Sequence, residues 1–429
     1  MKRKVGQYLD WWRKLGKERM PLLLYGARQT GKTYMLKEFG ASAYRNTVYM
    51  NFETEPSLAQ LFSDSIYPDK LIPKIERYLD THIAPKDTLI IFDEIQSCSR
   101  ALTSLKYFCE EAPEYDLIGA DSLLGVHTSS VDFSFPVGKV ITKMMYPMSF
   151  EEFLWESDKA VFAEKIEECF NNDMAMEQSL HESLMDFYRE YLIVGGMPLA
   201  VYNYYSGNTN LHYSEIQRIT VDTYVSDMTK YTDRSQSIKT INTYDSIVPQ
   251  LAKENKKFQY KLIAKGARAS LFRDPIDWLI RAGVVLKSVK VAHGNMPPNI
   301  AKDVSAFKLY MSDAGLASYK AGLTRVNMRI FDNTFMGGIT ENYVACTLAG
   351  NDYELFYWEA DSKAEVDFVI MKDGEVVPIE VKSNENTRSY SLSSYMKKYS
   401  PRYAIRVSGK NFGFENGIKS VPLYSAYMI

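Results

Sequence analysis

The stretch PLLLYGARQTGKTYMLKEFG, residues 21–40, carries the most specific structural signal in this chain. It begins with an apolar run typical of a buried parallel strand and ends in an amphipathic run that stops near Gly40. Between them lies the spacing Gly-x-x-x-x-Gly-Lys-Thr, from Gly26 to Thr33. Glycines let backbone N–H groups curl around an anion, and the N-terminus of the following helix adds its dipole. The order of strand, loop and helix therefore predicts the phosphate loop of a P-loop NTPase.

The residue types in this loop suit a nucleotide with a bound metal ion. Lys32 is expected to reach the β- and γ-phosphates, and the Thr33 hydroxyl is expected to coordinate Mg²⁺. The residues predicted to line the phosphates are Gly26, Ala27, Arg28, Gln29, Thr30, Gly31, Lys32 and Thr33.

A second apolar run, TLIIFDEIQSC (residues 88–98), ends in two carboxylates. Such a run is common by itself, but its place after a phosphate loop favours the metal-side strand of a P-loop NTPase. Asp93 is then expected to hold Mg²⁺ through water, and Glu94 to polarise the attacking water. Lys32 and Glu94 are thus the predicted catalytic residues of nucleotide hydrolysis.

A third strand is predicted in DLIGADSLLG, residues 116–125. The polar residue at its end, Asp121 or Ser122, is a candidate sensor of the γ-phosphate, although a plain turn explains the pattern equally well. Arg28 and Arg100 are not assigned as arginine fingers, because most arginines are simply exposed to solvent.

The composition sets limits on the function. A length of 429 residues predicts two to four domains, and a net charge of -2 gives no global attraction to nucleic acid or anionic membrane. The four cysteines show no paired spacing, so neither disulfides nor a zinc site is predicted. The basic N-terminus lacks a following apolar segment, and no stretch has the length and apolarity of a membrane span. Cytoplasmic residence is the expectation, without a membrane partner.

The middle of the chain has a different pattern. From about Phe150 to Tyr205 the periodicity is helical, and Ser149 with Glu152 forms a capping-box signature. A helical lid on the nucleotide domain is the prediction for this part.

Residues 230–325 read as a separate module. Helical stretches at 238–254, 260–267 and 271–282 precede two strands, VVLKSVKV and AFKLYMSD, which is the order of a winged helix-turn-helix. Basic residues cluster near its presumed recognition helix, and residues 253–273 are a candidate DNA contact. A solvated helix face is the alternative. The cluster consists of Lys256, Lys257, Lys261, Lys265, Arg268 and Arg273.

The segment EVDFVIMKDGEVVPIEVKSN, residues 365–384, predicts a β-hairpin that turns at Asp373-Gly374. Counting outward from the turn places Asp367 opposite Glu380, with Lys382 on the same face of the hairpin. Opposed carboxylates repel each other, unless a divalent ion lies between them.

This arrangement has two interpretations. One is an ordinary exposed hairpin. The other is a metal site in which Asp367, Glu380 and a helical Glu341 bind Mg²⁺ while Lys382 positions or deprotonates a water.

Taken together, these segments resemble a family of prokaryotic AAA-type ATPases that join a P-loop domain to a winged helix and a C-terminal restriction-endonuclease-like domain. The resemblance covers nearly the whole chain and rests on LLLYGARQTGKT, LIIFDEIQ, VGKVITKMMYPMSFEEFL, YLIVGGMP, AFKLYMSDAGL, ITENYVA and the hairpin. Two departures stand out: Gly119-Ala120-Asp121-Ser122 replaces a common Thr-Gly-Ser, and Lys139 stands where Arg is common.

The resemblance implies ATP binding by Gly26 to Thr33, with Asp93 and Glu94 on the metal side. It also implies that Glu341, Asp367, Glu380 and Lys382 match the positions of a PD-(D/E)xK nuclease centre.

The predicted fold is α/β: an AAA-type P-loop parallel sheet (1–150), a helical lid (151–229), a winged helix-turn-helix (230–326) and a nuclease-like α/β domain (327–429). The preferred function is a Mg²⁺-dependent ATPase that acts on a nucleic-acid or protein partner. DNA cleavage by the C-terminal domain and a non-hydrolytic ATP-gated switch are the alternatives, and a homo-oligomer stays open.

Overall fold

A parallel β-sheet organises the first of two units in the computed structural model, which describes residues 1–122, 135–207, 211–230, 232–328, 333–360, 364–385 and 390–429. In these residues the sheet has five strands in the order β2-β3-β4-β1-β5, and each neighbouring pair is parallel. The predicted α/β P-loop fold is therefore confirmed for this unit. The strands are β1 (Leu22–Tyr25), β2 (Asn46–Asn51), β3 (Thr88–Asp93), β4 (Asp116–Asp121) and β5 (Ile141–Met144).

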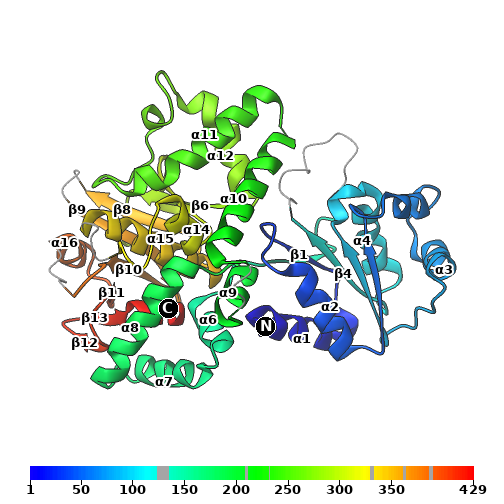
Figure 1. Cartoon of the computed structure of the whole chain (residues 1–429), viewed down its shortest axis with the longest axis horizontal. Helices are drawn as coiled ribbons and strands as arrows, with labels where there is room; N and C mark the ends of the chain where they lie inside the picture. The colour runs from blue at the N-terminus through cyan, green and yellow to red at the C-terminus, as the bar shows by residue number, and fades with distance from the viewer. Residues whose placement is uncertain (123–134, 208–210, 231, 329–332, 361–363, 386–389) are drawn as a thin grey trace. The chain divides into compact units, whose positions relative to one another are not determined.

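Helices cover both faces of this sheet (Figure 1). Because successive strand residues point to opposite faces, Leu23 packs in one core, whereas Leu22 and Leu24 pack in the other. Helices α3 (Pro68–Leu79) and α4 (Ser99–Glu111) contribute to the first core. Helices α1 (Lys4–Lys14) and α2 (Lys32–Ala43) contribute to the second. The described residues of this unit also contain the 3-10 helices η1 (Gly16–Glu18), η2 (Pro56–Phe62) and η3 (Ile95–Ser97).

The second unit comprises Pro147–Ile280 and Val284–Ile429, and it begins with helices as predicted. The capping box is present, since the Ser149 N–H donates to Glu152 Oε2 at 2.8 Å and the Glu152 N–H donates to Ser149 Oγ at 3.3 Å. The helices are α6 (Phe150–Glu156), α7 (Ala160–Asn171), α8 (Gln178–Val194), α9 (Pro198–Tyr205), α10 (Tyr213–Lys230), α11 (Arg234–Leu251) and α12 (Ala269–Arg281).

The predicted middle helix of the winged module, at 260–267, is wrong. Only the 3-10 turn η4 (Tyr260–Leu262) forms there, and Gly266 has a positive φ of 81° that helices exclude. The two predicted strands form as β6 (Val285–Val291) and β7 (Lys302–Met311), paired antiparallel, with the short α13 (Pro298–Ala301) in their connection.

A mixed sheet fills the rest of the second unit. In the described residues its order is β12-β13-β11-β10-β9-β8-β6-β7, and β6 pairs parallel with β8. The hairpin of the predicted winged module thus continues into the sheet of the predicted C-terminal domain, across the proposed boundary at 326/327. The strands are β8 (Phe356–Ala360), β9 (Ala364–Lys372), β10 (Glu375–Val381), β11 (Ala404–Ser408), β12 (Gly413–Glu415) and β13 (Ile418–Pro422).

Further helical segments contact this sheet: α14 (Ala314–Lys320), α15 (Asn333–Gly350), α16 (Tyr390–Tyr399) and the 3-10 helix η5 (Leu423–Met428). Among the described residues, none of the helices is both long and apolar enough to cross a membrane.

The β9–β10 hairpin has the predicted register. Lys372 pairs with Glu375, and Phe368 pairs with Ile379. Asp373 and Gly374 have φ angles of 51° and 80°, as a two-residue primed turn requires.

Candidate nucleotide site and acidic centre

The phosphate loop connects β1 directly to α2. Gly26, Gln29 and Gly31 have φ angles of 151°, 67° and 92°, so the loop depends on backbone conformations that favour glycine. A Cβ atom on Gly26 would lie 2.3 Å from the Met145 carbonyl oxygen, which leaves room for glycine alone. Helix α2 begins at Lys32 with Gly31 as its N-cap, so its first N–H groups border the loop.

Lys32 is buried against the loop that precedes it. Its Nζ donates to the carbonyl oxygens of Gly26 at 2.8 Å and of Ala27 at 2.9 Å. Burial lowers the pKa of Lys32 to about 8, although the charges of Glu94 and Asp121 act in the opposite direction. A phosphate oxygen is a stronger acceptor for an ammonium group than a neutral carbonyl, so this side chain is suited to exchange its partners for an anion.

The two predicted Mg²⁺ ligands touch each other. Thr33 Oγ1 donates to Asp93 Oδ2 at 2.8 Å, although the residues are 60 positions apart. Tyr49 from β2 donates to the same oxygen at 2.7 Å, and the Glu94 N–H donates to Asp93 Oδ1 at 3.0 Å. A hydroxyl beside a carboxylate at the end of a phosphate loop fits Mg²⁺ held together with a nucleotide. Sequence reasoning missed Tyr49, whose pKa rises to about 12 through burial and its bond to Asp93.

Glu94 lies at the end of β3, in a left-handed backbone conformation with a φ of 48°. Its Oε2 accepts hydrogen bonds from Ser122 Oγ at 2.8 Å and from Gln96 Nε2 at 2.5 Å. The two sensor candidates therefore differ. Ser122 donates a hydrogen bond to Glu94, whereas the negative charge of the buried Asp121 favours the charged form of Lys32 and so opposes the lowering of its pKa. These contacts fix the direction in which Glu94 presents its carboxylate.

Three other cations of this unit have protein partners. Arg28 contacts Glu53 at 3.4 Å, Arg100 donates to the Phe62 carbonyl at 2.6 Å, and Lys139 pairs with Glu110 at 3.0 Å. None of the three contacts gives evidence for an arginine finger.

One arginine that sequence reasoning missed supports the loop. Arg3, just before α1, donates to the carbonyls of Thr30 at 2.9 Å and Tyr146 at 2.7 Å. Its only sequence signal is the basic N-terminus, which is not specific.

The predicted nuclease residues do come together in the second unit. Ligand oxygens of Glu341 on α15 and of Glu365 and Asp367 on β9 lie within 4.8 Å of one another. The Val381 N–H donates to Asp367 Oδ2 at 2.8 Å, next to Glu380, and Lys382 Nζ lies 2.6 Å from Glu380 Oε1. We call this set of residues, together with the lysines and tyrosine described next, the acidic centre.

Cations that the sequence did not reveal lie inside the acidic centre. Lys308 on β7 is fully buried, and its Nζ lies 2.8 Å from Glu341 Oε1 and 2.5 Å from Glu365 Oε1. Lys256 pairs with the other oxygen of Glu341. The hydroxyl of Tyr310, two residues after Lys308 on the same strand face, donates to Glu341 at 2.5 Å. A lysine within the otherwise apolar strand AFKLYM was the available signal.

These contacts set the charges of the centre. Burial alone would raise the pKa of Glu341, but Lys256 and Lys308 outweigh it and hold that pKa well below its usual range. Burial, reinforced by Glu341 and Glu380, raises the pKa of Asp367 well above its usual value. The pKa values of Glu341 and Asp367 are therefore shifted in opposite directions.

Lysines already occupy part of the donor set that the sequence predicted for a divalent ion, namely Glu341, Asp367 and Glu380. Mg²⁺ requires ionised oxygens that face the ion. Both oxygens of Glu341 already bind ammonium groups and Oε1 of Glu380 binds Lys382, whereas Asp367 Oδ2 accepts the Val381 N–H.

The predicted DNA-contact stripe also changes. Lys256 is no longer a candidate DNA contact, because its side chain is only 15% exposed and pairs with Glu341. Four other members of the stripe are exposed: Lys261, Lys265, Arg268 and Arg273.

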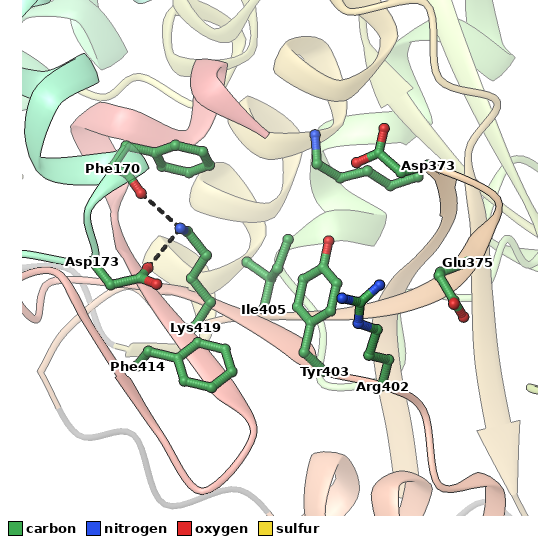
Figure 2. A pocket seen from close by; sticks show the side chains of 10 residues that line it. Phe170, Asp173, Asp373, Glu375, Arg402, Tyr403, Ile405, Phe414 and Lys419 are labelled. Carbon is green, nitrogen blue, oxygen red and sulfur yellow. Dashed lines mark hydrogen bonds and ion pairs between the residues drawn. The ribbon is translucent and has the colours of Figure 1, made fainter.

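A pocket of about 400 Å³ lies elsewhere in the second unit (Figure 2). Lys419 spans it by donating to the Phe170 carbonyl at 2.7 Å and to Asp173 at 2.6 Å. The charged residues of its lining are balanced in sign, so the lining gives no preference for an anion or a cation. They are Lys372, Arg402, Lys419, Asp173, Asp373 and Glu375.

Family models match three successive parts of the chain. An AAA domain matches residues 18–154, and two domains of unknown function, DUF8612 and DUF4143, match residues 185–327 and 336–426. Residues 18–154 thus form an AAA-type P-loop ATPase domain, whereas the other two models carry no function. No curated protein matches the chain.

Solved structures with similarity to the chain are distant. A Walker-type ATPase of Pyrococcus abyssi is 11% identical, with a TM-score of 0.42 over 75% of this chain and 95% of that one. The ORC2 protein of Aeropyrum pernix is 12% identical, with a TM-score of 0.37 over 75% and 94%. The RuvB branch migration motor of Thermotoga maritima is 15% identical, with a TM-score of 0.28 over 66% and 87%. The fold assignment rests on the sheet order and the phosphate loop instead.

Proposed function

We propose that this protein binds ATP with Mg²⁺ and hydrolyses it to remodel a nucleic-acid or protein partner. The observation that carries the proposal is the contact between Thr33 and Asp93, formed at the mouth of the phosphate loop beside the buried Lys32. It joins both halves of a P-loop NTPase site from distant parts of the sequence.

Each residue has a distinct task in the proposed reaction. The loop from Gly26 to Gly31 offers backbone N–H groups to the phosphates, and Lys32 binds the β- and γ-phosphate oxygens. Thr33 and Asp93 would hold Mg²⁺, which neutralises phosphate charge when bound. Glu94, oriented by Ser122 and Gln96, polarises the attacking water.

Steady-state ATP turnover of the Lys32→Ala variant tests this proposal. Turnover is expected to disappear while the fold is retained. Lys70→Ala is the matched control, because Lys70 is an exposed lysine of the same unit. Undiminished hydrolysis in Lys32→Ala would refute the ATPase.

The Glu94→Gln variant separates an ATPase from an ATP-gated switch. The substitution keeps the size of the side chain but removes the charge that polarises water. A hydrolysing machine loses its output in this variant, whereas a switch retains it as long as ATP binds.

A nucleic-acid partner is supported by the exposed cations Lys261, Lys265, Arg268 and Arg273. Such a stripe can neutralise phosphates, and its binding then weakens steeply with salt. ATP turnover measured with single-stranded and double-stranded DNA and RNA identifies the partner class. If no nucleic acid stimulates turnover, a protein partner is the remaining proposal. Cytoplasmic residence and homo-oligomerisation stay predictions.

A further inference from the structure

The acidic centre has its own internal cations. Lys308 contributes an ammonium group that is fully buried between Glu341 and Glu365, at 2.8 and 2.5 Å. Lys256 approaches Glu341 from the other side, and Lys382 pairs with Glu380 at 2.6 Å. Glu341, Glu365 and Glu380 therefore each have a lysine partner, whereas Asp367 Oδ2 accepts the Val381 N–H.

The position of Lys308 is fixed by its surroundings. Strand β7 lies beside β6 in the sheet, and Ser288 on β6 is the residue that pairs with Lys308. The ammonium group also lies 5.0 Å from the centre of the Tyr357 ring. Entry of a divalent ion between Glu341 and Glu365 would have to displace a buried ammonium group that has no solvent-exposed surface.

The paired residues come from segments far apart in the chain. Lys256 follows α11, Lys308 belongs to β7, Glu341 belongs to α15 and Glu365 belongs to β9. The ion pairs thus join the predicted winged module to the predicted nuclease-like domain, which share one sheet.

We infer that the acidic centre is a metal-independent ion-pair anchor, in which Lys308 and Lys256 take the place of a divalent cation. The centre fastens the segment after α11 and strand β7 to α15 and β9. Metal-dependent DNA cleavage is not expected there, because both oxygens of Glu341 and one oxygen of Glu365 are bound to lysine. This inference does not depend on ATP hydrolysis at the phosphate loop.

Binding of Mn²⁺ to the full-length, nucleotide-free protein tests the inference. Bound Mn²⁺ is measured by the loss of the electron paramagnetic resonance signal of the free ion. Any Mn²⁺ bound by the wild type is expected to be lost in Asp93→Asn, which removes the ligand at the phosphate loop, and to be unchanged in Asp367→Asn. Binding that survives Asp93→Asn but disappears in Asp367→Asn would overturn the inference.

The Lys308→Ala variant tests whether removal of the lysine allows Mn²⁺ to bind. Removing the buried ammonium group is expected to create Mn²⁺ binding that Asp367→Asn then abolishes. A folded Lys308→Ala protein that binds no Mn²⁺ would contradict the claim that lysine excludes the ion. If this variant does not fold, Lys256→Ala replaces it, since that side chain is partly exposed and also contacts Glu341.

DNA nicking gives an independent readout. Wild-type protein with Mg²⁺ or Mn²⁺, with and without ATP, is expected to leave supercoiled plasmid intact. Nicking that depends on both Asp367 and Lys382 would overturn the inference.

Discussion

Lys32 in the phosphate loop and Lys308 in the acidic centre are both buried lysines close to carboxylates, yet their partners differ. Lys32 donates to two backbone carbonyls, and burial lowers its pKa to about 8. Lys308 lies between two carboxylates, whose charges overcome burial and raise its pKa well above the usual value. A lysine held by neutral groups is ready for an anionic ligand, whereas a lysine paired with carboxylates is already satisfied.

The largest effect on stability is expected when Lys308, the lysine paired with carboxylates, is replaced. Lys308→Met should lower the free energy of unfolding by about 4 kcal/mol, because it leaves buried carboxylates with less compensation. Urea denaturation measures the change, and Lys397→Met is the exposed control in the same unit. Adding Glu341→Gln should recover part of the loss. A change below about 1 kcal/mol would show that the buried pairs contribute little.

Removing the ligand-ready lysine should affect chemistry instead of stability. Lys32→Ala is expected to lower ATP turnover by about 10²-fold or more, since it deletes a cation that stabilises the transferring phosphate. Its denaturation midpoint should stay close to that of the wild type. A large loss of stability in Lys32→Ala would contradict the claim that Lys32 serves ligand binding whereas Lys308 serves stability.

The pKa of Lys32 predicts a pH dependence. Its folded pKa of about 8 lies below the unfolded value of roughly 10.4, so the charged side chain costs stability below pH 8. This cost is relieved as pH rises from about 8 to 10. ATP binding has the opposite trend, because the phosphates need the ammonium form, and affinity should fall roughly tenfold between pH 7 and pH 9.

Affinity measured by calorimetry at several pH values checks this trend. Lys32→Arg should remove it, because arginine stays protonated throughout the range. The ion pair between Lys308 and Glu341 should not change its charge between pH 7 and pH 9, because the pKa of Lys308 is raised and the pKa of Glu341 is lowered. An affinity of the wild type for ATP that is constant from pH 7 to pH 9 would contradict the claim that Lys32 loses its proton within this interval.

The smallest effect is expected at the bond that orients Glu94. Ser122→Ala removes a neutral donor to a charged acceptor, so turnover should fall about fivefold while ATP affinity is unchanged. Ser97→Ala is the neighbouring control on an exposed side chain. Equal turnover in both variants would assign the orientation of Glu94 to Gln96 alone.

The sequence predicted local chemistry well. The phosphate loop is contiguous, so its spacing alone identified Lys32 and Thr33, and the Asp373-Gly374 turn determined the hairpin register. Asp93 was predicted because a buried apolar run that ends in two carboxylates follows the phosphate loop.

The sequence could not reveal pairs that form only through tertiary folding. Lys308 and Lys256 meet Glu341 across 33 and 85 residues, and no periodicity connects them. The sequence places Lys256 in a basic stripe, because a charged residue between helical stretches is expected to be exposed unless a buried partner is known. The predicted helix at 260–267 is replaced by the 3-10 turn η4, which ends at Leu262.

The most direct test of the account is ATP turnover by full-length wild type, Lys32→Ala and Asp367→Asn, measured side by side with Mg²⁺. Turnover is expected to be lost in Lys32→Ala and retained in Asp367→Asn, because the phosphate loop carries the chemistry and the acidic centre does not. Turnover that persists in Lys32→Ala would contradict it.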